Sequence, residues 1–130
     1  MHDHQHDETA LPTVIRNADT ETYSPPRHSG TTNRRLLDGS VTNGLYNVVH
    51  GHIEHGGEAE EHHHRYSTQF LHILSGSCRV TLDSAVVILE SGESVFIPVG
   101  VRHHVEVLDP AGITLINVYQ PALASDDTLA

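Results

Sequence analysis

The sequence contains a single cysteine, Cys78, no tryptophan, and only two phenylalanines and four tyrosines. One cysteine excludes an internal disulfide and fits a reducing compartment, and we expect Cys78 to be a small buried side chain on a strand. With so few aromatic residues, the core must rest on Val, Ile and Leu, which favour strands. The 130 residues can bury one core of this kind and leave no room for a second domain.

Basic residues are also scarce, with 7 lysines and arginines against 17 aspartates and glutamates and a formal net charge of -10. Such a charge disfavours binding to nucleic acid or to anionic membranes. No apolar run reaches the roughly 18 residues that cross a bilayer, and the amino terminus lacks the pattern of a signal peptide. We therefore expect a soluble, cytoplasmic protein that binds neither nucleic acid nor a membrane.

Composition divides the chain into a disordered tail, an extended N-terminal arm, a β-barrel and a C-terminal tail, at residues 1–12, 13–43, 44–121 and 122–130. The tail is polar and rich in histidine, and the arm is rich in turn residues with short possible strands at 14–16 and 34–37. Later strand-like runs occupy residues 45–53, 69–74, 78–82, 85–89, 94–97, 104–108 and 113–119. The first of them is expected to end at Gly56 and Gly57. Short strands at this spacing predict an all-β fold, a double-sheet jelly roll.

Two of the thirteen histidines, His62 and His64, are two positions apart in a strand-like region. Because strand side chains alternate faces, both point to the same side and can bind one ion together. A third imidazole from a neighbouring strand would complete the three nitrogen donors of a site that keeps open positions for water or substrate. His103 is the candidate for that third ligand.

The residues around these histidines have a characteristic spacing. The first set is Gly56, His62, His64, Gln69 and Gly76, and the second is Gly92, Pro98, Gly100 and His103. These spacings resemble both signature motifs of the cupin superfamily, and the resemblance covers roughly residues 40 to 121. It implies a double-stranded β-helix, the cupin barrel, with a metal bound by the three histidines. One position departs from the family pattern, because Gln69 stands where cupins usually have a glutamate. In small cupins an N-terminal arm often pairs with the barrel of a partner subunit.

The predicted ligands make one divalent transition metal the expected cofactor, with zinc first and nickel, manganese or iron as alternatives. Gln69 is uncharged and can bind through its carbonyl oxygen or hydrogen-bond a metal water. The ion then keeps more of its positive charge and is a stronger Lewis acid than with a glutamate.

Strand alternation also predicts the surroundings of the metal. If Gln69 points inward, so do Leu71 and Ile73, while Phe70 and Leu74 face outward. Two exposed apolar side chains on one face need to be covered, and we expect a homodimer as the simplest arrangement that covers them. His103 inward implies that Val105 is inward as well. We expect the cavity wall for a small organic substrate to consist of four apolar side chains, Leu71, Ile73, Phe96 and Val105.

The candidate catalytic residues are Tyr119 and Asn117, which share a face of the last barrel strand and would orient the substrate. A general base would come from His50 or His52, with His55 a further possibility. His104 alternates with His103, so we expect it to face away from the site.

Three functions fit the sequence. The first is non-redox Lewis-acid chemistry on an enolisable carbonyl or phenolic substrate, as in an isomerase or a cupin-type polyketide cyclase. The resemblance also admits an Fe(II)-dependent dioxygenase, since some cupin dioxygenases have three histidines and no carboxylate. The third is a small-molecule-binding cupin without catalysis. No arginine follows the last strand, which disfavours a sugar-acid substrate and favours a more apolar ketone or phenol.

Overall fold

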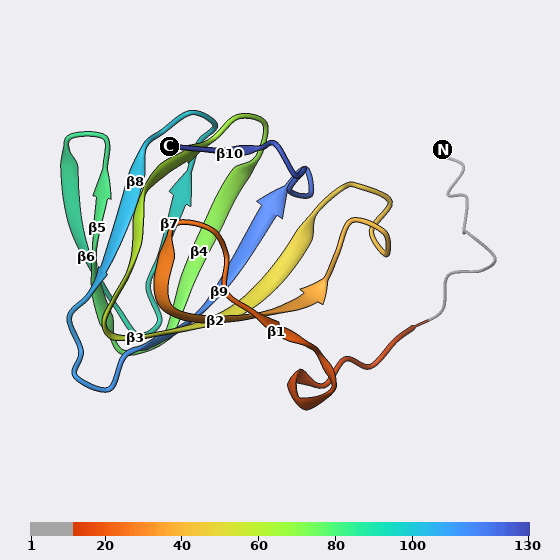
Figure 1. Cartoon of the computed structure of the whole chain (residues 1–130), viewed down its shortest axis with the longest axis horizontal. Helices are drawn as coiled ribbons and strands as arrows, with labels where there is room; N and C mark the ends of the chain where they lie inside the picture. The colour runs from red at the N-terminus through yellow and green to blue at the C-terminus, as the bar shows by residue number, and fades with distance from the viewer. Residues whose placement is uncertain (1–11) are drawn as a thin grey trace.

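The computed structural model describes residues 12–130, and almost all of its regular structure is β-strand (Figure 1). The tail predicted at residues 1–12 lies outside this range except for Pro12. A 3-10 helix, Asn17–Asp19, precedes the strands, and no helix in the described part of the chain is long and apolar enough to cross a membrane. The strands are β1 (Thr22–Tyr23), β2 (His28–Leu37), β3 (Asn47–His64), β4 (Thr68–Ser75), β5 (Ser77–Leu82), β6 (Ala85–Glu90), β7 (Ser94–Ile97), β8 (His103–Val107), β9 (Ile113–Gln120) and β10 (Thr128–Leu129).

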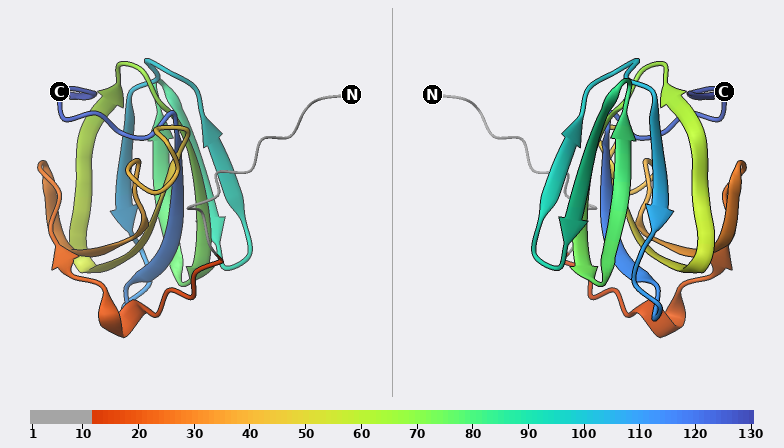
Figure 2. Two further views of the ribbon diagram at one scale, coloured as in Figure 1. Left: turned by 90° about the vertical axis from the view of Figure 1, so that its right-hand side faces the viewer. Right: turned by 90° about the vertical axis from the view of Figure 1, so that its left-hand side faces the viewer.

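The strands form a nearly closed antiparallel barrel, which confirms the predicted all-β jelly roll. Their order is β6-β5-β8-β3-β9-β4-β7, and β2 also pairs with β3. β3 joins the two halves, because its residues 47–53 pair with β9 and its residues 58–62 pair with β8. Figure 2 shows the strands curving round a shared interior. Side chains on the inner faces of both halves therefore point towards one another.

β3 is longer than the sequence predicts. It does not end at Gly56 and Gly57 but continues through both to His64. Gly56 has a φ of 86°, a conformation that glycine adopts without strain, and a Cβ atom on Gly57 would lie 2.5 Å from the carbonyl oxygen of Ser29. The two glycines therefore bend the strand and let β2 approach closely, and they carry the chain on to His62 and His64.

The N-terminal arm contributes β1 and β2. β2 pairs with β3 of the same chain, from His28 opposite Ala59 to Leu37 opposite Val48. The predicted run at residues 34–37 lies within β2, but the strand predicted at residues 14–16 is wrong. Val14 is 74% exposed there, and strand propensity alone does not form a strand without a neighbouring edge and a buried face.

The apolar core fills the inner faces of the strands. On β4, Leu71 and Ile73 are 2% and 0% exposed, whereas Phe70 and Leu74 are each 43% exposed, so the predicted alternation is confirmed. Cys78 is buried in the same core, as predicted, and burial raises the pKa of its thiol to about 11. The buried cluster consists of Ile53, Ala59, Leu71, Ile73, Cys78, Val80, Leu89, Val105, Val107, Ile113 and Leu115.

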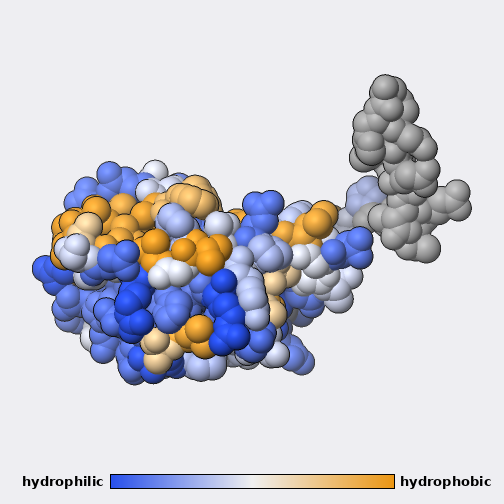
Figure 3. All heavy atoms as spheres, turned by 90° about the horizontal axis from the view of Figure 1, so that it is seen from above, coloured by the Kyte–Doolittle hydropathy of each residue, from blue (hydrophilic) through white to orange (hydrophobic). Residues whose placement is uncertain are grey.

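Three apolar side chains lie exposed on the outer face of β4 and β7. Phe70 and Phe96 are register partners, 43% and 58% exposed, and Leu74 is 43% exposed. Figure 3 shows further apolar side chains at the end of the barrel that carries the β5–β6 hairpin. Exposed apolar faces of this kind mark interaction sites. We propose that a second copy of the chain covers this face and that the protein is a homodimer.

Light scattering should therefore give twice the subunit mass of 14.3 kDa. Phe96→Asp should reduce the mass to one subunit, because a charge in the covered face opposes association. Val41→Asp, at an exposed position in the β2–β3 loop, is the matched control and should leave the mass unchanged. A wild-type protein with the mass of one subunit would contradict the dimer.

Candidate metal centre

Three histidines meet inside the barrel. His62 and His64 lie at the end of β3, where alternation puts them on one face, and His103 begins β8 opposite His62. The three residues are 4%, 3% and 1% exposed, and one ring nitrogen from each lies within 4.8 Å of the other two. The structure thus brings together the three histidines selected from the sequence.

Each of the three rings has its Nδ1 atom engaged by an oxygen. The partners of His62, His103 and His64 are the carbonyl oxygens of Glu60 and Val101 and the carboxylate of Asp127, at 2.7, 3.0 and 2.9 Å respectively. Because these oxygens can only accept, each neutral ring donates from Nδ1 and keeps a lone pair on Nε2. The Nε2 atom of His103 is buried and has no hydrogen-bond partner within residues 12–130.

Burial sets the charge of the three imidazoles. Desolvation lowers the pKa of His62 to about 3 and that of His103 to about 4. It also lowers the pKa of His64, where burial outweighs the opposing effect of the Asp127 carboxylate. All three rings are therefore neutral at pH 7, which is the form that donates a lone pair to a metal ion.

Gln69 adds a fourth acceptor at the same point. It is 4% exposed, its Nε2 atom donates to Oδ1 of Asn117 at 2.8 Å, and its Oε1 atom lies 3.1 Å from Nε2 of His64. Because His64 carries its proton on Nδ1, the two atoms of this close pair are both acceptors. A cation placed between these two acceptors and the unpaired nitrogen of His103 would satisfy all three. The residues present therefore fit a metal ion with three imidazole ligands and an amide oxygen.

A cavity of about 480 Å³ opens onto these four side chains. Four of the other residues selected from the sequence line it, namely Leu71, Val105, Asn117 and Tyr119. Burial raises the pKa of Tyr119 above its usual value, so its hydroxyl group stays protonated. Its ring lies 5.3 Å from that of His64, and the hydroxyl has no hydrogen-bond partner in the described part of the chain.

Four other expected site residues lie elsewhere. Phe96 is 58% exposed on the outer face, because it pairs with the outward Phe70 across β4 and β7. Ile73 is fully buried in the core and does not line the cavity. His50 and His52 alternate with the inward Val49 and Ile53, so their side chains face away from the cavity, and Nδ1 of His52 lies 3.3 Å from Thr114 Oγ1. The assignments of Phe96, Ile73, His50 and His52 to the site were therefore wrong.

Two residues of β2 line the cavity although the sequence analysis does not identify them. The Nδ1 atom of His28 donates to the carbonyl oxygen of Pro26 at 2.9 Å, its ring lies 5.7 Å from that of His62, and burial lowers its pKa. The guanidinium group of Arg35 lies 4.5 Å from the centre of the Tyr23 ring. Neither residue belongs to a motif, and only the pairing of β2 with β3 brings them to the site.

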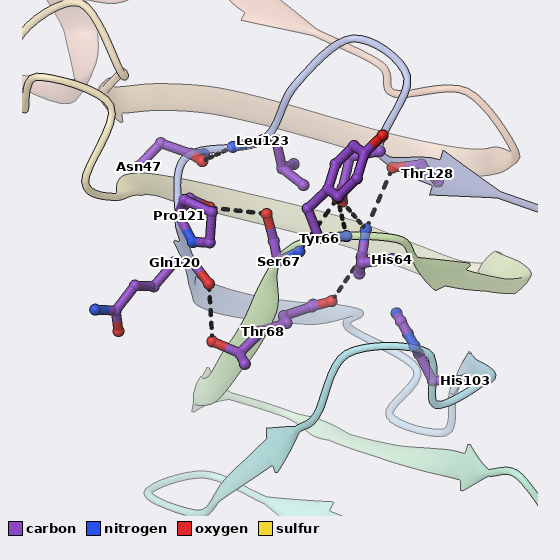
Figure 4. Close-up of polar contacts among 12 residues, drawn as sticks. Asn47, His64, Tyr66, Ser67, Thr68, His103, Gln120, Pro121, Leu123 and Thr128 are labelled. Atoms are coloured by element: carbon purple, nitrogen blue, oxygen red, sulfur yellow. Dashed lines mark hydrogen bonds and ion pairs between the residues drawn. The ribbon is translucent and has the colours of Figure 1, made fainter.

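Asp127 is a third residue that the sequence analysis misses. It lies in the C-terminal tail predicted at residues 122–130, yet it is 0% exposed and contacts His64. Figure 4 shows His64 between the C-terminal segment with Thr128 on one side and His103 on the other.

The family model of the cupin domain matches residues 49–119, which is more than half of the 130-residue chain. The chain belongs to the cupin family. This cupin is 33% identical over 85 residues to the tetracenomycin polyketide synthase protein TcmJ of Streptomyces glaucescens. That match covers 64% of this chain and 56% of TcmJ, so the cupin spans little more than half the length of that relative.

Solved structures with the same cupin fold have names that indicate different activities. The polyketide cyclase RemF from Streptomyces resistomycificus has a TM-score of 0.72 and 19% identity, over 90% of this chain and 89% of RemF. An oxalate decarboxylase from Bacillus subtilis has a TM-score of 0.74 and 20% identity, over 94% of this chain and 34% of that chain. At these identities the likeness shows the fold alone. The activity of the cupin must therefore be argued from its site.

Proposed function

We propose that this cupin is a metal-dependent enzyme that carries out non-redox chemistry on an enolisable ketone or phenol, as a cyclase or isomerase. The observation that carries the proposal is the convergence of four uncharged donors, three imidazole nitrogens and the amide oxygen of Gln69, on one point of the cavity wall. A divalent ion bound by uncharged ligands acts as a Lewis acid that polarises a carbonyl oxygen. Zinc is the first candidate, because it binds imidazole ligands and acts as a Lewis acid without changing its oxidation state. Nickel, manganese and iron are the alternatives.

Three residues of the chain can orient the substrate and move protons. The protonated hydroxyl of Tyr119 can donate a hydrogen bond to a substrate oxygen. Asn117 uses its Oδ1 atom to hold Gln69, which leaves its NH₂ group for the substrate. His28 donates from Nδ1 to Pro26, so its Nε2 atom is the basic nitrogen that can accept a proton from carbon. His28 thus takes the role that the sequence analysis gave to His50 or His52.

The walls of the cavity suggest the class of substrate. Much of the lining away from the ligands is apolar, with Leu71, Val105, Ile53 and Leu115, and two arginines, Arg27 and Arg35, add positive charge. These walls suit an aromatic ketone or phenol with one anionic or strongly polarised oxygen. The name of TcmJ assigns that relative to a polyketide synthase, and RemF is named a polyketide cyclase. We therefore propose a polyketide-like aromatic substrate.

The proposal is tested by solvent-deuterium exchange at the methyl group of an o-hydroxyaryl methyl ketone. The exchange is measured by proton NMR under anaerobic conditions. Metal-free protein reconstituted with zinc should accelerate exchange by about 100-fold or more over the same zinc concentration without protein, as positioned acid-base groups do. A chelator should abolish the acceleration. His28→Gln should reduce the rate of exchange. His104→Ala is the control and should not reduce it, because His104 pairs with Glu58. Exchange no faster than with free zinc would contradict the proposal.

The same samples separate the dioxygenase alternative. Three imidazoles suit ferrous iron as well as zinc, so the donor set alone does not distinguish the two activities. Oxygen uptake that requires ferrous iron, together with no anaerobic exchange under zinc, nickel or manganese, would replace the proposed function by a dioxygenase.

A further inference from the structure

Asp127 is a fully buried acidic residue in the C-terminal segment, three positions before Ala130. Its Oδ1 atom accepts hydrogen bonds from the backbone N–H groups of Tyr66 and Ser67, at 2.6 and 3.2 Å. Its Oδ2 atom lies 2.9 Å from Nδ1 of His64. A buried carboxylate is costly unless donors surround it, and here three donors converge on it. The fold therefore provides hydrogen-bond donors for this buried carboxylate.

The C-terminal segment holds Asp127 firmly against β3. β10 pairs with the end of β3, with Thr128 opposite His64, and the backbone N–H of Arg65 donates to the Asp127 carbonyl oxygen at 2.8 Å. The hydroxyl group of Ser67 donates to the carbonyl oxygen of Pro121 at 2.8 Å (Figure 4). In Figure 1 the segment crosses one end of the barrel to reach this position. Backbone contacts on both sides thus fix the carboxylate before any ion binds.

We infer that Asp127 is a positioning residue of the metal centre, which fixes the ring orientation and tautomer of His64 so that Nε2 faces the ion. A carboxylate only accepts, so its contact with Nδ1 puts the proton there and leaves the lone pair on Nε2. The same contact makes His64 a more basic ligand, as acidic partners of metal-binding histidines do. The other two histidines receive only a carbonyl oxygen at Nδ1, so His64 is the ligand with an anionic partner.

This inference rests on the metal centre of the proposed function, and Asp127→Asn tests it. If the asparagine oxygen keeps the two backbone N–H donors, its NH₂ group faces Nδ1 of His64, which must then accept. The proton moves to Nε2, where the ion would bind. We expect zinc affinity, measured by competition with a chromophoric chelator, to fall by about 10- to 100-fold. Asp126→Asn removes the same charge from the exposed neighbouring residue and should leave the affinity unchanged.

The tautomer itself gives a second readout that requires neither metal nor activity. Hydrogen–nitrogen correlation spectra of the metal-free wild type should show the His64 proton on Nδ1, and those of Asp127→Asn should show it on Nε2. A proton on Nε2 in the wild type would overturn the inference even if the variant failed to fold. So would a variant that melts at a lower temperature but keeps the wild-type zinc affinity. A wild type that binds no zinc would instead overturn the proposed function, and the wild-type tautomer would still test the role of Asp127.

Discussion

Replacing His103 by alanine should abolish tight metal binding. The Nε2 atom of His103 is buried and unpaired within residues 12–130, and its only evident partner is an ion shared with His62 and His64. Loss of this ligand leaves two imidazoles and Gln69, so we expect zinc affinity to fall by more than the roughly 100-fold that changes to outer partners cost. Competition with a chromophoric chelator measures the change.

His104→Ala is the matched control for this variant. His104 is the next residue on β8, but it alternates away from the cavity and pairs with Glu58. Both variants remove an imidazole from the same strand, and only the inward one should lose the ion. A His103→Ala protein that keeps one tightly bound zinc ion per subunit would show that the three histidines are not the ligands.

Replacing Gln69 by glutamate should preserve metal binding but slow the reaction. The new carboxylate occupies the volume of the amide, and Asn117 can turn its own amide to donate to it. Zinc affinity should be equal or higher, because the ligand is anionic. The ion would lose part of its charge and polarise the substrate less, so we expect kcat to fall about tenfold or more, equivalent to at least about 1.4 kcal/mol. Zinc titration and anaerobic deuterium exchange measure the two effects separately.

Gln120→Glu makes the same change of charge at an exposed residue of β9, outside the cavity. It should alter neither zinc affinity nor rate. If Gln69→Glu exchanged deuterium as fast as the wild type or faster, an uncharged residue at this position would have no role in the reaction.

The metal ligands were predictable from the sequence because they depend on strand geometry. Alternation with a period of two places His62 and His64 together, and it also turns Leu71 inward and Phe70 outward. Phe96 was misplaced because its face depends on the register between β4 and β7, which the sequence does not reveal. Its pairing with Phe70 puts both rings on the outer surface.

The missing site residues depend on contacts between distant segments. Asp127 lies 63 positions from His64, and only the return of the C-terminal segment along β3 joins them. His28 reaches the cavity because β2 pairs with β3, and Gly57 admits that pairing at close range. His50 and His52 were chosen as bases although alternation with Val49 turns them outward. Such residues have no local signal, because the tertiary fold creates their surroundings.

Elemental analysis of protein purified without a metal-affinity step or chelator tests the central claim, the metal centre, most directly. The account predicts close to one divalent transition metal ion per subunit, with zinc, nickel or manganese for Lewis-acid chemistry. Bound iron would also support the metal centre, and oxygen uptake would then be the next measurement. Protein that contains no metal, and takes up none of these four ions when each is added in excess, would contradict the account.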